Sequence, residues 1–293
     1  MLIDLHMHTS RSDGQYSTEE VLKFCNELNL EIISITDHDT IDAYYDINKP
    51  NAFNGRIIKG IELSFGLNGR LYDILGYNID LQVIGKWLNE KYPKEEQLKK
   101  QQYILAKMQE IYSNLGFTFD KNIPLSTGLK SEAYTKMIMS LLSYPKNLQL
   151  EPELDKPNFY KKHHTNTASK YYVDETINLP SIKEAIDTIH KAGGVAILAH
   201  SGAYGFNENE LCDFIELAIK NGIDGIELKY PAHTPEQEKT ILEFVKKHNL
   251  ITTGGSDFHG EKIKPQVSLN ITYGEHQLTE KDIISLLNKI DNN

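Results

Sequence analysis

The chain begins with Ile3-Asp4-Leu5-His6-Met7-His8-Thr9, and Ser12-Asp13-Gly14 follows shortly after. Side chains of a β-strand alternate between its two faces, so a strand that includes His6 and His8 points both imidazoles to one side. Two converging neutral imidazoles, with the carboxylate of Asp13 on the next loop, are typical of the start of a transition-metal site. The opening stretch therefore predicts a first strand with a metal centre at its end.

Strand and helix patterns alternate before and after a middle segment that lacks strand patterns. Short apolar segments predict strands at 3–5, 32–36, 57–63, 71–76, 195–199, 225–228 and 251–254. Helical patterns occupy 18–28, 182–192, 210–221, the residues after Thr234-Pro235, and those from about 280. Capping-box pairs, Ser17 with Glu20 and Ser181 with Glu184, mark two of the helix starts. Residues 92–178 instead show helical stretches at 95–115 and 132–143, without strand alternation.

Repeated βα units predict the fold class. They favour an α/β fold with a parallel sheet, and their number in a chain of 293 residues favours a barrel. We expect a discontinuous barrel domain of residues 1–91 and 179–293. An inserted, mainly helical domain of residues 92–178 is expected to cover or contact the substrate.

Composition indicates an ordinary water-soluble globular protein, with 40% hydrophobic and 25% charged residues. No apolar run approaches the roughly 20 residues that span a bilayer. The first residues lack the flanks of a signal peptide, so we expect a cytoplasmic protein without a membrane segment. Cys25 and Cys212 lie in amphipathic helical patterns and are expected to be free thiols.

Charge is divided unevenly along the chain. The whole chain carries −10, but residues 94–170 hold 12 Lys against 8 Asp and Glu, so the remainder, by subtraction, carries about −14. A strongly acidic body suits divalent cations better than a nucleic-acid duplex. The lysine-rich middle predicts either a solvated surface or contacts to an anionic substrate.

Histidines and carboxylates stand at the ends of six expected strands, where barrels of this kind keep their chemistry. After His6 and His8 come Asp37-His38-Asp39, Glu62, Asp73, His200 and Asp257-Phe258-His259. We expect these side chains to converge at one rim. Asp4, Asp37 and Asp39 are interpreted as groups that orient the ligands or cap loops.

Together these motifs resemble one protein family. Asp-x-His-x-His-Thr, Ser-Asp-Gly, Thr-Asp-His, Gly-x-Glu, Ala-His and Ser-Asp-Phe-His occur in the order and spacing of the PHP (polymerase and histidinol phosphatase) family, across both outer thirds of the chain. The resemblance implies a distorted seven-stranded (β/α) barrel. It also implies two or three bound divalent metal ions, which would be Mn, Zn or Fe.

The same resemblance implies which side chains bind the ions. One site would comprise four of them, His6, His8, Glu62 and Asp257. A second would comprise Asp13, His38 and His259. Glu62 would bridge to a third site completed by His200. Family members usually place a further histidine in the strand Leu71-Tyr-Asp-Ile-Leu-Gly-Tyr77, where this chain has Asp73, a carboxylate that can also bind such metals.

Two features resemble the PHP phosphoesterases that act on nucleotides, which include nucleoside 3′,5′-bisphosphate phosphatases and 5′→3′ exoribonucleases. One is the helical insertion, and the other is the stretch Gly225-Ile-Glu…Tyr-Pro-Ala-His-Thr-Pro-Glu-Gln237. Those relatives often carry an Arg-Pro-His element in the insertion and a Pro-Gly-Arg turn after Ala-His. This chain reads Gly128-Leu-Lys130 and Ser201-Gly-Ala203 instead, and lysine does not bind phosphate bidentately as arginine does.

Six basic groups are candidate substrate contacts: Arg11, Lys130, Lys136, Lys162, His164 and His233. The lysines and His164 could form a basic lid with neighbouring tyrosines or belong to a solvated loop. His233 could contact phosphate or cap its own helix. Arg11 could face the substrate or form a salt bridge on its loop.

The expected activity is hydrolysis of a phosphomonoester, of a nucleotide or a nucleoside bisphosphate. Two cations about 3.5–4 Å apart can share a water, lower its pKa and aim the bridging hydroxide at phosphorus. They also neutralise the non-bridging oxygens. The leaving alkoxide needs a proton, for which His200, His233 and a carboxylate such as Asp257 are the candidate catalytic groups.

Other functions stay open at this point. They are a phosphodiesterase acting on short single-stranded RNA or DNA ends, a small-molecule phosphatase such as one for histidinol phosphate, an amidohydrolase-type barrel, which also begins with His-x-His, and a non-catalytic metal-binding PHP module. No membrane and no obligate protein partner is expected.

Overall fold

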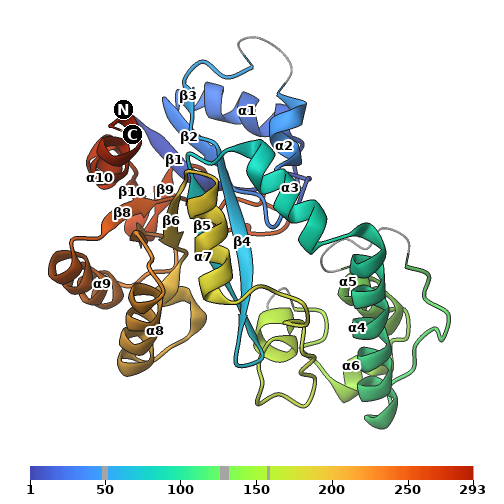
Figure 1. The fold of residues 1–293 in the computed structure, drawn as a ribbon. Helices are drawn as coiled ribbons and strands as arrows, with labels where there is room; N and C mark the ends of the chain where they lie inside the picture. The colour runs from blue at the N-terminus through green and yellow to red at the C-terminus, as the bar shows by residue number, and fades with distance from the viewer. Residues whose placement is uncertain (48–51, 126–131, 157–158, 293) are drawn as a thin grey trace. The chain divides into compact units, whose positions relative to one another are not determined.

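The chain divides into two compact units in a computed structural model that describes residues 1–47, 52–125, 132–156 and 159–292 (Figure 1). The first unit comprises Met1–Phe65, Tyr72–Leu88 and Pro180–Asn293, and the second comprises Gly66–Leu71 and Asn89–Leu179. Among the described residues, no helix is both long enough and apolar enough to cross a membrane.

The first unit is a mixed α/β structure in which three strands form a parallel sheet in the order β1 (Ile3–Met7), β2 (Ile32–Ile35) and β3 (Arg56–Ile57). A second sheet has the order β4 (Gly60–Leu67), β5 (Arg70–Tyr77), β6 (Val195–Leu198), β7 (Gly225–Lys229) and β8 (Ile251–Gly254). Two short strands, β9 (Ile271–Thr272) and β10 (His276–Gln277), pair antiparallel.

The expected closed barrel is not confirmed, because these ladders form separate sheets. Among the described residues, isolated bridges join the two larger sheets, one between Met7 and Phe258 and one between His38 and Glu62. The run of parallel strands is also interrupted, since β5 pairs antiparallel with β6. A two-residue turn, Asn68-Gly69, in which both residues have positive φ, links β4 to β5, and such a short turn joins antiparallel strands only.

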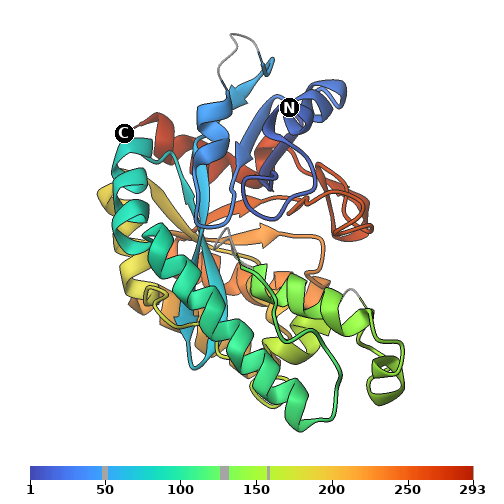
Figure 2. The ribbon, with the colours of Figure 1, turned by 90° about the vertical axis from the view of Figure 1, so that its right-hand side faces the viewer.

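Helices pack on the outside of these strands (Figures 1 and 2). They are α1 (Thr18–Glu27), α2 (Asp42–Asp46), α3 (Leu81–Lys91), α7 (Ile182–Lys191), α8 (Glu208–Lys220), α9 (Pro235–His248) and α10 (Glu280–Asp291). The predicted capping box at Ser17 is present, and the side chain of Ser181 accepts the expected bond from the Glu184 amide. Apolar residues of β1, β5, β6 and α10 form a core in which Ile3, Leu5 and Ile197 are fully buried. This core fixes β1, and with it His6 and His8.

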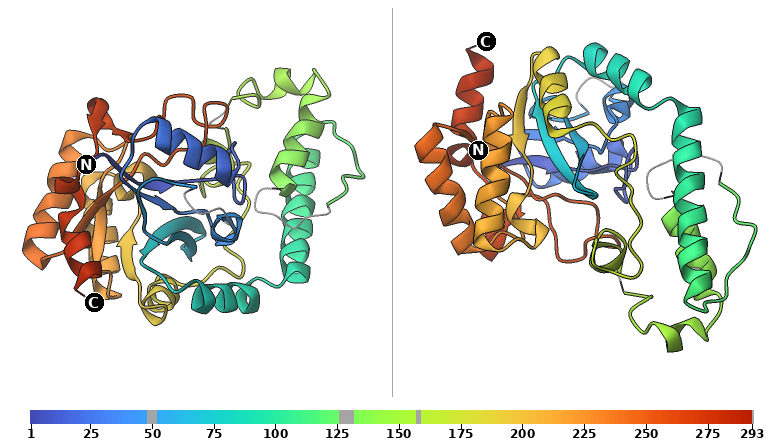
Figure 3. Two further views of the ribbon diagram at one scale, coloured as in Figure 1. Left: turned by 90° about the horizontal axis from the view of Figure 1, so that it is seen from above. Right: turned by 60° about the horizontal axis from the view of Figure 1, so that its bottom comes forward.

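The second unit is helical apart from the tip of the β4–β5 hairpin, as far as it is described. Its helices are α4 (Lys94–Asn114), α5 (Glu132–Leu142) and α6 (Asn147–Leu150), followed by a π-helical turn, η1 (Tyr160–His164). Helices α4 and α5 lie side by side in both views of Figure 3. They enclose a separate core that includes Met108, Tyr112, Met137, Phe159 and Tyr171. Each unit therefore has its own hydrophobic core.

Candidate metal centre

Strand β1 places His6 and His8 on one side of the sheet. Both side chains are buried, and their ring centroids are 5.2 Å apart. The intervening Met7 points to the other side, into a core with Val21 and Ile33. The alternation expected from the sequence thus directs both imidazoles to the same place.

The nine candidate ligands lie in four overlapping groups of His, Asp and Glu side chains. Within each group one potential ligand atom per residue lies within 4.8 Å of the others. The groups are His8, Asp13, His38 and His259; His6, His8 and Asp257; His6, Glu62 and His200; and His38, Glu62 and Asp73. Residues that are up to 253 positions apart in the sequence therefore meet, some just after β1, β2, β6 and β8 and others, Glu62 and Asp73, inside β4 and β5.

Glu62 occupies the middle of this cluster. Its Oε2 lies 3.3 Å from His6 Nε2, 3.2 Å from His8 Nε2 and 3.2 Å from His38 Nδ1. Its Oε1 lies 2.9 Å from His200 Nε2. A carboxylate with histidines on both oxygens is suited to bridge two cations.

Asp13 forms the outer part of the cluster. Its carboxylate lies 3.2 Å from His259 Nε2, 3.6 Å from His8 Nδ1 and 3.8 Å from His38 Nε2. The side chain of Asp13 is 47% exposed, whereas that of Glu62 is fully buried. The group around Asp13 is therefore the one that opens to solvent.

Electrostatics of the cluster fit divalent cations. Burial lowers the pKa of His8, but the nearby carboxylates of Asp257 and Glu62, each 3.2 Å from Nε2, raise that pKa to about 9. Burial also lowers the pKa of His6, and the charges of Glu227, Glu62 and Asp257 raise it well above its ordinary value. The same carboxylates that draw protons onto the imidazoles would hold a cation in their place, with release of those protons.

One buried nitrogen supports this fit directly. His8 Nε2 has no hydrogen-bond partner among the described residues, although it lies 3.2 Å from Asp257 Oδ1 as well as from Glu62. A buried polar atom without a hydrogen bond is unfavourable in a folded protein. Coordination of a metal ion by this nitrogen would satisfy it.

Asp73 does not join the group predicted for it. It was expected to bind a third ion with Glu62 and His200, but its Oδ1 lies 3.7 Å from His38 Nδ1, and no described group contains both Asp73 and His200. Its carboxylate accepts hydrogen bonds from Ser64 Oγ at 3.0 Å and from the Tyr204 hydroxyl at 3.3 Å. Asp73 and His200 therefore fall in two different groups, both of which contain Glu62.

Three residues around the cluster were not among the predicted site residues. Glu227, in the middle of β7, is fully buried; its Oε1 lies 2.9 Å from His6 Nδ1, and its Oε2 accepts a 2.8 Å bond from the His200 amide. Tyr230 donates to Asp257 Oδ2 at 2.6 Å, and Lys264 donates to the same oxygen. The stretch Gly225–Gln237, quoted above for its resemblance, contains Glu227 and Tyr230 and could have pointed to both, whereas Lys264 lies in no such motif.

Asp37 and Asp4 hold the loops that carry ligands, as predicted. Asp37 accepts bonds from the Thr9 amide and hydroxyl, both at 2.7 Å, and from Ser12 Oγ at 2.6 Å. Asp4 accepts bonds from the amide and hydroxyl of Ser256 and from the Asn270 amide. These contacts fix the segments that lead to Asp13 and Asp257.

Two candidate ligands have left-handed backbone conformations. His200 has a φ of 27° and Asp257 a φ of 55°, each costing about 1–3 kcal/mol for a residue with a Cβ. Hydrogen bonds hold both, since Glu227 accepts from the His200 amide and the His6 carbonyl accepts from the Asp257 amide at 2.7 Å. The tertiary structure thus imposes these conformations at the centre.

His233 and Arg11 do not contact the site as expected. The buried ring of His233 lies with Nδ1 3.0 Å from the Leu228 carbonyl oxygen, while Nε2 accepts from the Gly202 amide at 3.1 Å. Both nitrogens of His233 are therefore engaged with backbone groups, and Thr234, not His233, caps the helix. Arg11 forms a two-pronged salt bridge with Asp46, which is the alternative left open for it.

The described members of the expected basic lid have partners inside the second unit. Lys136 donates to Glu132 at 2.7 Å and to the Pro124 carbonyl, and Lys162 donates to Glu153. His164 is fully buried with Nε2 2.8 Å from the Tyr112 hydroxyl, and burial lowers its pKa to about 3. These side chains are thus engaged with partners inside the second unit, while Lys130 lies outside the described residues.

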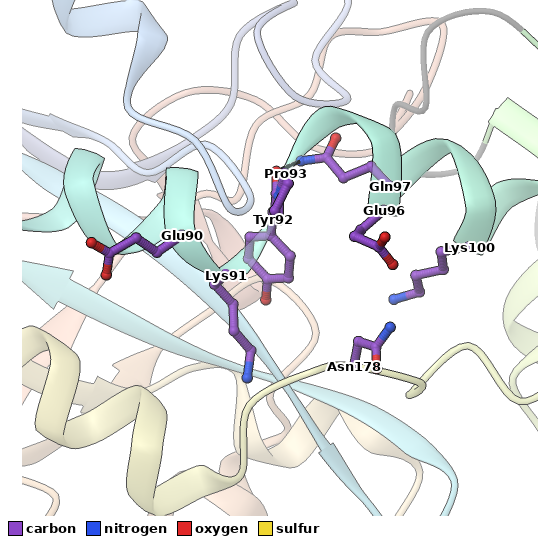
Figure 4. A pocket seen from close by; sticks show the side chains of 8 residues that line it. All are labelled: Glu90, Lys91, Tyr92, Pro93, Glu96, Gln97, Lys100 and Asn178. Atoms are coloured by element: carbon purple, nitrogen blue, oxygen red, sulfur yellow. Dashed lines mark hydrogen bonds between the residues drawn. The ribbon is translucent and has the colours of Figure 1, made fainter.

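A pocket within the second unit contains none of the candidate residues. Its volume is about 320 Å³, and it lies at the junction where α3 ends and α4 begins (Figure 4). Eight side chains line it: Glu90, Lys91, Tyr92, Pro93, Glu96, Gln97, Lys100 and Asn178. Equal numbers of lysines and glutamates give it no net charge that would select a phosphate.

Comparison with known proteins gives concordant matches. The family model described as the PHP domain matches residues 4–180. A 5′-3′ exoribonuclease of Haemophilus influenzae is 27% identical over 87% of this chain and 89% of its own length. A 3′,5′-nucleoside bisphosphate phosphatase of Chromobacterium violaceum is 23% identical over 88% and 87%. A crystal structure of a candidate metal-dependent phosphoesterase from Bifidobacterium adolescentis superposes with a TM-score of 0.66 at 24% identity, covering 98% of this chain and 94% of that one.

Proposed function

Because this chain belongs to the PHP domain family and is a metal-dependent phosphoesterase, we propose that it hydrolyses a phosphomonoester of a nucleotide or a nucleoside bisphosphate. The observation that carries the proposal is the convergence of nine His, Asp and Glu side chains in overlapping groups around Glu62. Imidazole and carboxylate donors in this mixture suit Mn²⁺, Zn²⁺ or Fe. We propose two or three such ions at this centre.

When bound, the ions supply positive charge and Lewis acidity for hydrolysis of a phosphate ester. The chain's own residues hold the ligands in place for this. Glu227 turns His6 so that its Nε2 faces Glu62 and Asp257, while Tyr230 and Lys264 hold Asp257 Oδ2 and leave Oδ1 toward His6 and His8. Fixed ligands need no rearrangement when charge develops on the phosphate.

Proton donation to the leaving group is assigned to His200. The alternative at Asp257 is disfavoured, because the charges of Lys264 and His6 outweigh burial and lower its pKa well below its ordinary value, so it stays ionised at neutral pH. The other alternative, His233, has both nitrogens engaged. His200 lies at the edge of the cluster and is 9% exposed. Since its Nε2 lies 2.9 Å from Glu62, we propose that its imidazole donates this proton when it is not bound to an ion.

A phosphate-release screen tests the proposal. Protein reconstituted with Mn²⁺ would be offered nucleoside monophosphates and nucleoside 3′,5′-bisphosphates, with released phosphate measured by colour formation. A His8→Ala variant serves as the inactive control. The proposal predicts phosphate release by the wild type alone, and a metal-loaded wild type that releases none from any of these esters would refute it.

The exoribonuclease match supports a second candidate, removal of nucleotides from a 5′ RNA end, since it covers most of both chains. The same protein would be offered a short 5′-phosphorylated oligoribonucleotide, and the products would be resolved by gel electrophoresis. Shortening of the oligonucleotide without phosphate release from mononucleotides would favour this candidate.

A further inference from the structure

The three donors expected for a third ion do not come together, although the backbone brings two of their strands side by side. The Ala199 amide donates to the Asp73 carbonyl oxygen at 3.3 Å, so positions 73 and 200 are near neighbours. His200 nevertheless groups with Glu62 and His6, whereas Asp73 groups with Glu62 and His38. The side chain at position 73, and not the strand pairing, therefore separates the three donors expected for a third ion.

The carboxylate of Asp73 is held away from His200 by hydrogen bonds. Ser64 Oγ donates to Oδ1 at 3.0 Å, and the Tyr204 hydroxyl lies 3.3 Å from Oδ2. The Tyr204 oxygen also accepts from the Asp73 amide at 3.0 Å. Rotating this buried carboxylate toward a third ion would break these bonds and leave the phenol without this acceptor.

Tyr204 contacts both Asp73 and His200. It ends the turn η2 (Ser201–Tyr204) that follows His200, and its ring centroid lies 5.2 Å from that of His200 at an interplanar angle of 63°. Its ring also packs in a T-shaped arrangement against that of Tyr72, with the two centroids 4.7 Å apart. The ring is thus fixed on one imidazole while its hydroxyl engages Asp73.

We propose that Asp73 and Tyr204 form a hydrogen-bonded pair that takes the place of the third metal site, so that the chain holds two ions. An aspartate oxygen reaches less far from the backbone than the Nε2 of a histidine, which explains why this short side chain bonds to Tyr204 and lies toward His38. The inference rests on the proposed metal-dependent function and narrows it to a two-metal centre.

Metal stoichiometry tests the inference. Metal-free protein would be dialysed against excess Mn²⁺ and then against metal-free buffer, and the ions per chain measured by inductively coupled plasma mass spectrometry without substrate. We expect two ions in the wild type and in Tyr204→Phe. The double variant D73H/Y204F places the longer histidine side chain at position 73 and removes the hydroxyl of Tyr204 that would bond to it. We expect this variant to bind three ions per chain.

Two results would overturn the inference: three ions in the wild type, or only two in a D73H/Y204F variant whose thermal melting shows it to be folded. The count is independent of turnover. Two bound ions without hydrolysis of any phosphate ester would therefore refute the proposed function and support this inference. Three bound ions together with hydrolysis would support the proposed function and refute this inference.

Discussion

Glu227 ties two candidate ligands to one buried carboxylate, and its replacement by glutamine tests how the centre is assembled. One oxygen lies 2.9 Å from His6 Nδ1, and the other accepts from the His200 amide at 2.8 Å. With a proton on Nδ1, His6 presents a bare Nε2 toward Glu62 and Asp257. Glu227 thus sets the His6 tautomer that a metal ion requires.

Glutamine keeps the shape of Glu227 but offers one acceptor. If its oxygen stays with the His200 amide, its amide group donates to His6 Nδ1 and the ring proton moves to Nε2, which then cannot bind metal. If its oxygen turns to His6, the strained His200 amide loses its acceptor. Either arrangement loses a hydrogen bond to a charged group, worth about 1.5–3 kcal/mol, so we expect Glu227→Gln to bind Mn²⁺ about 10–100-fold more weakly.

Competition with a fluorescent chelator measures that affinity. Glu216→Gln, on the exposed face of α8, changes charge in the same way away from the cluster and should keep wild-type affinity. Phosphate release at saturating Mn²⁺ should recover much of the activity of Glu227→Gln. Wild-type Mn²⁺ affinity in Glu227→Gln would refute the reasoning that Glu227 positions His6.

Three further outcomes are expected. His8→Ala should lose bound metal and phosphate release together, because His8 contacts both Glu62 and Asp257; retention of the full metal content by elemental analysis would contradict its role. Lys264→Met should weaken Mn²⁺ binding about 10-fold, because Asp257 loses a charged donor, whereas Lys264→Arg should not; equal chelator-competition affinities would argue against it. His164 has a pKa of about 3 in the folded chain against about 6.5 unfolded, so the unfolded state binds more protons as pH falls through 6.5. Urea denaturation should therefore show the second unit about 2 kcal/mol less stable at pH 5 than at pH 7, and less pH-dependent in His164→Phe.

Local sequence determined strand alternation and helix starts, and the resemblance of its motifs to one family predicted the candidate ligands. The period of two in Ile3–Met7 directs His6 and His8 to one face, and Ser17 forms its capping box with Glu20. Other candidate ligands lie inside their strands, Glu62 in β4 and Asp73 in β5. The alternation and the capping depend on residues a few positions apart, so the sequence alone specifies them.

Only the tertiary structure decided which distant groups become partners. Arg11 pairs with Asp46, Glu227 with His6 and Asp73 with Tyr204, and no local pattern distinguishes these pairs from the alternatives. The alternation of strand and helix patterns in the sequence likewise did not predict that β5 pairs antiparallel with β6. Such contacts depend on how strands pair and how far each side chain reaches, which are properties of the packed chain. For that reason the sequence predicted the chemistry of the centre, while the fold set the partners of Asp73 and with them our expected number of ions.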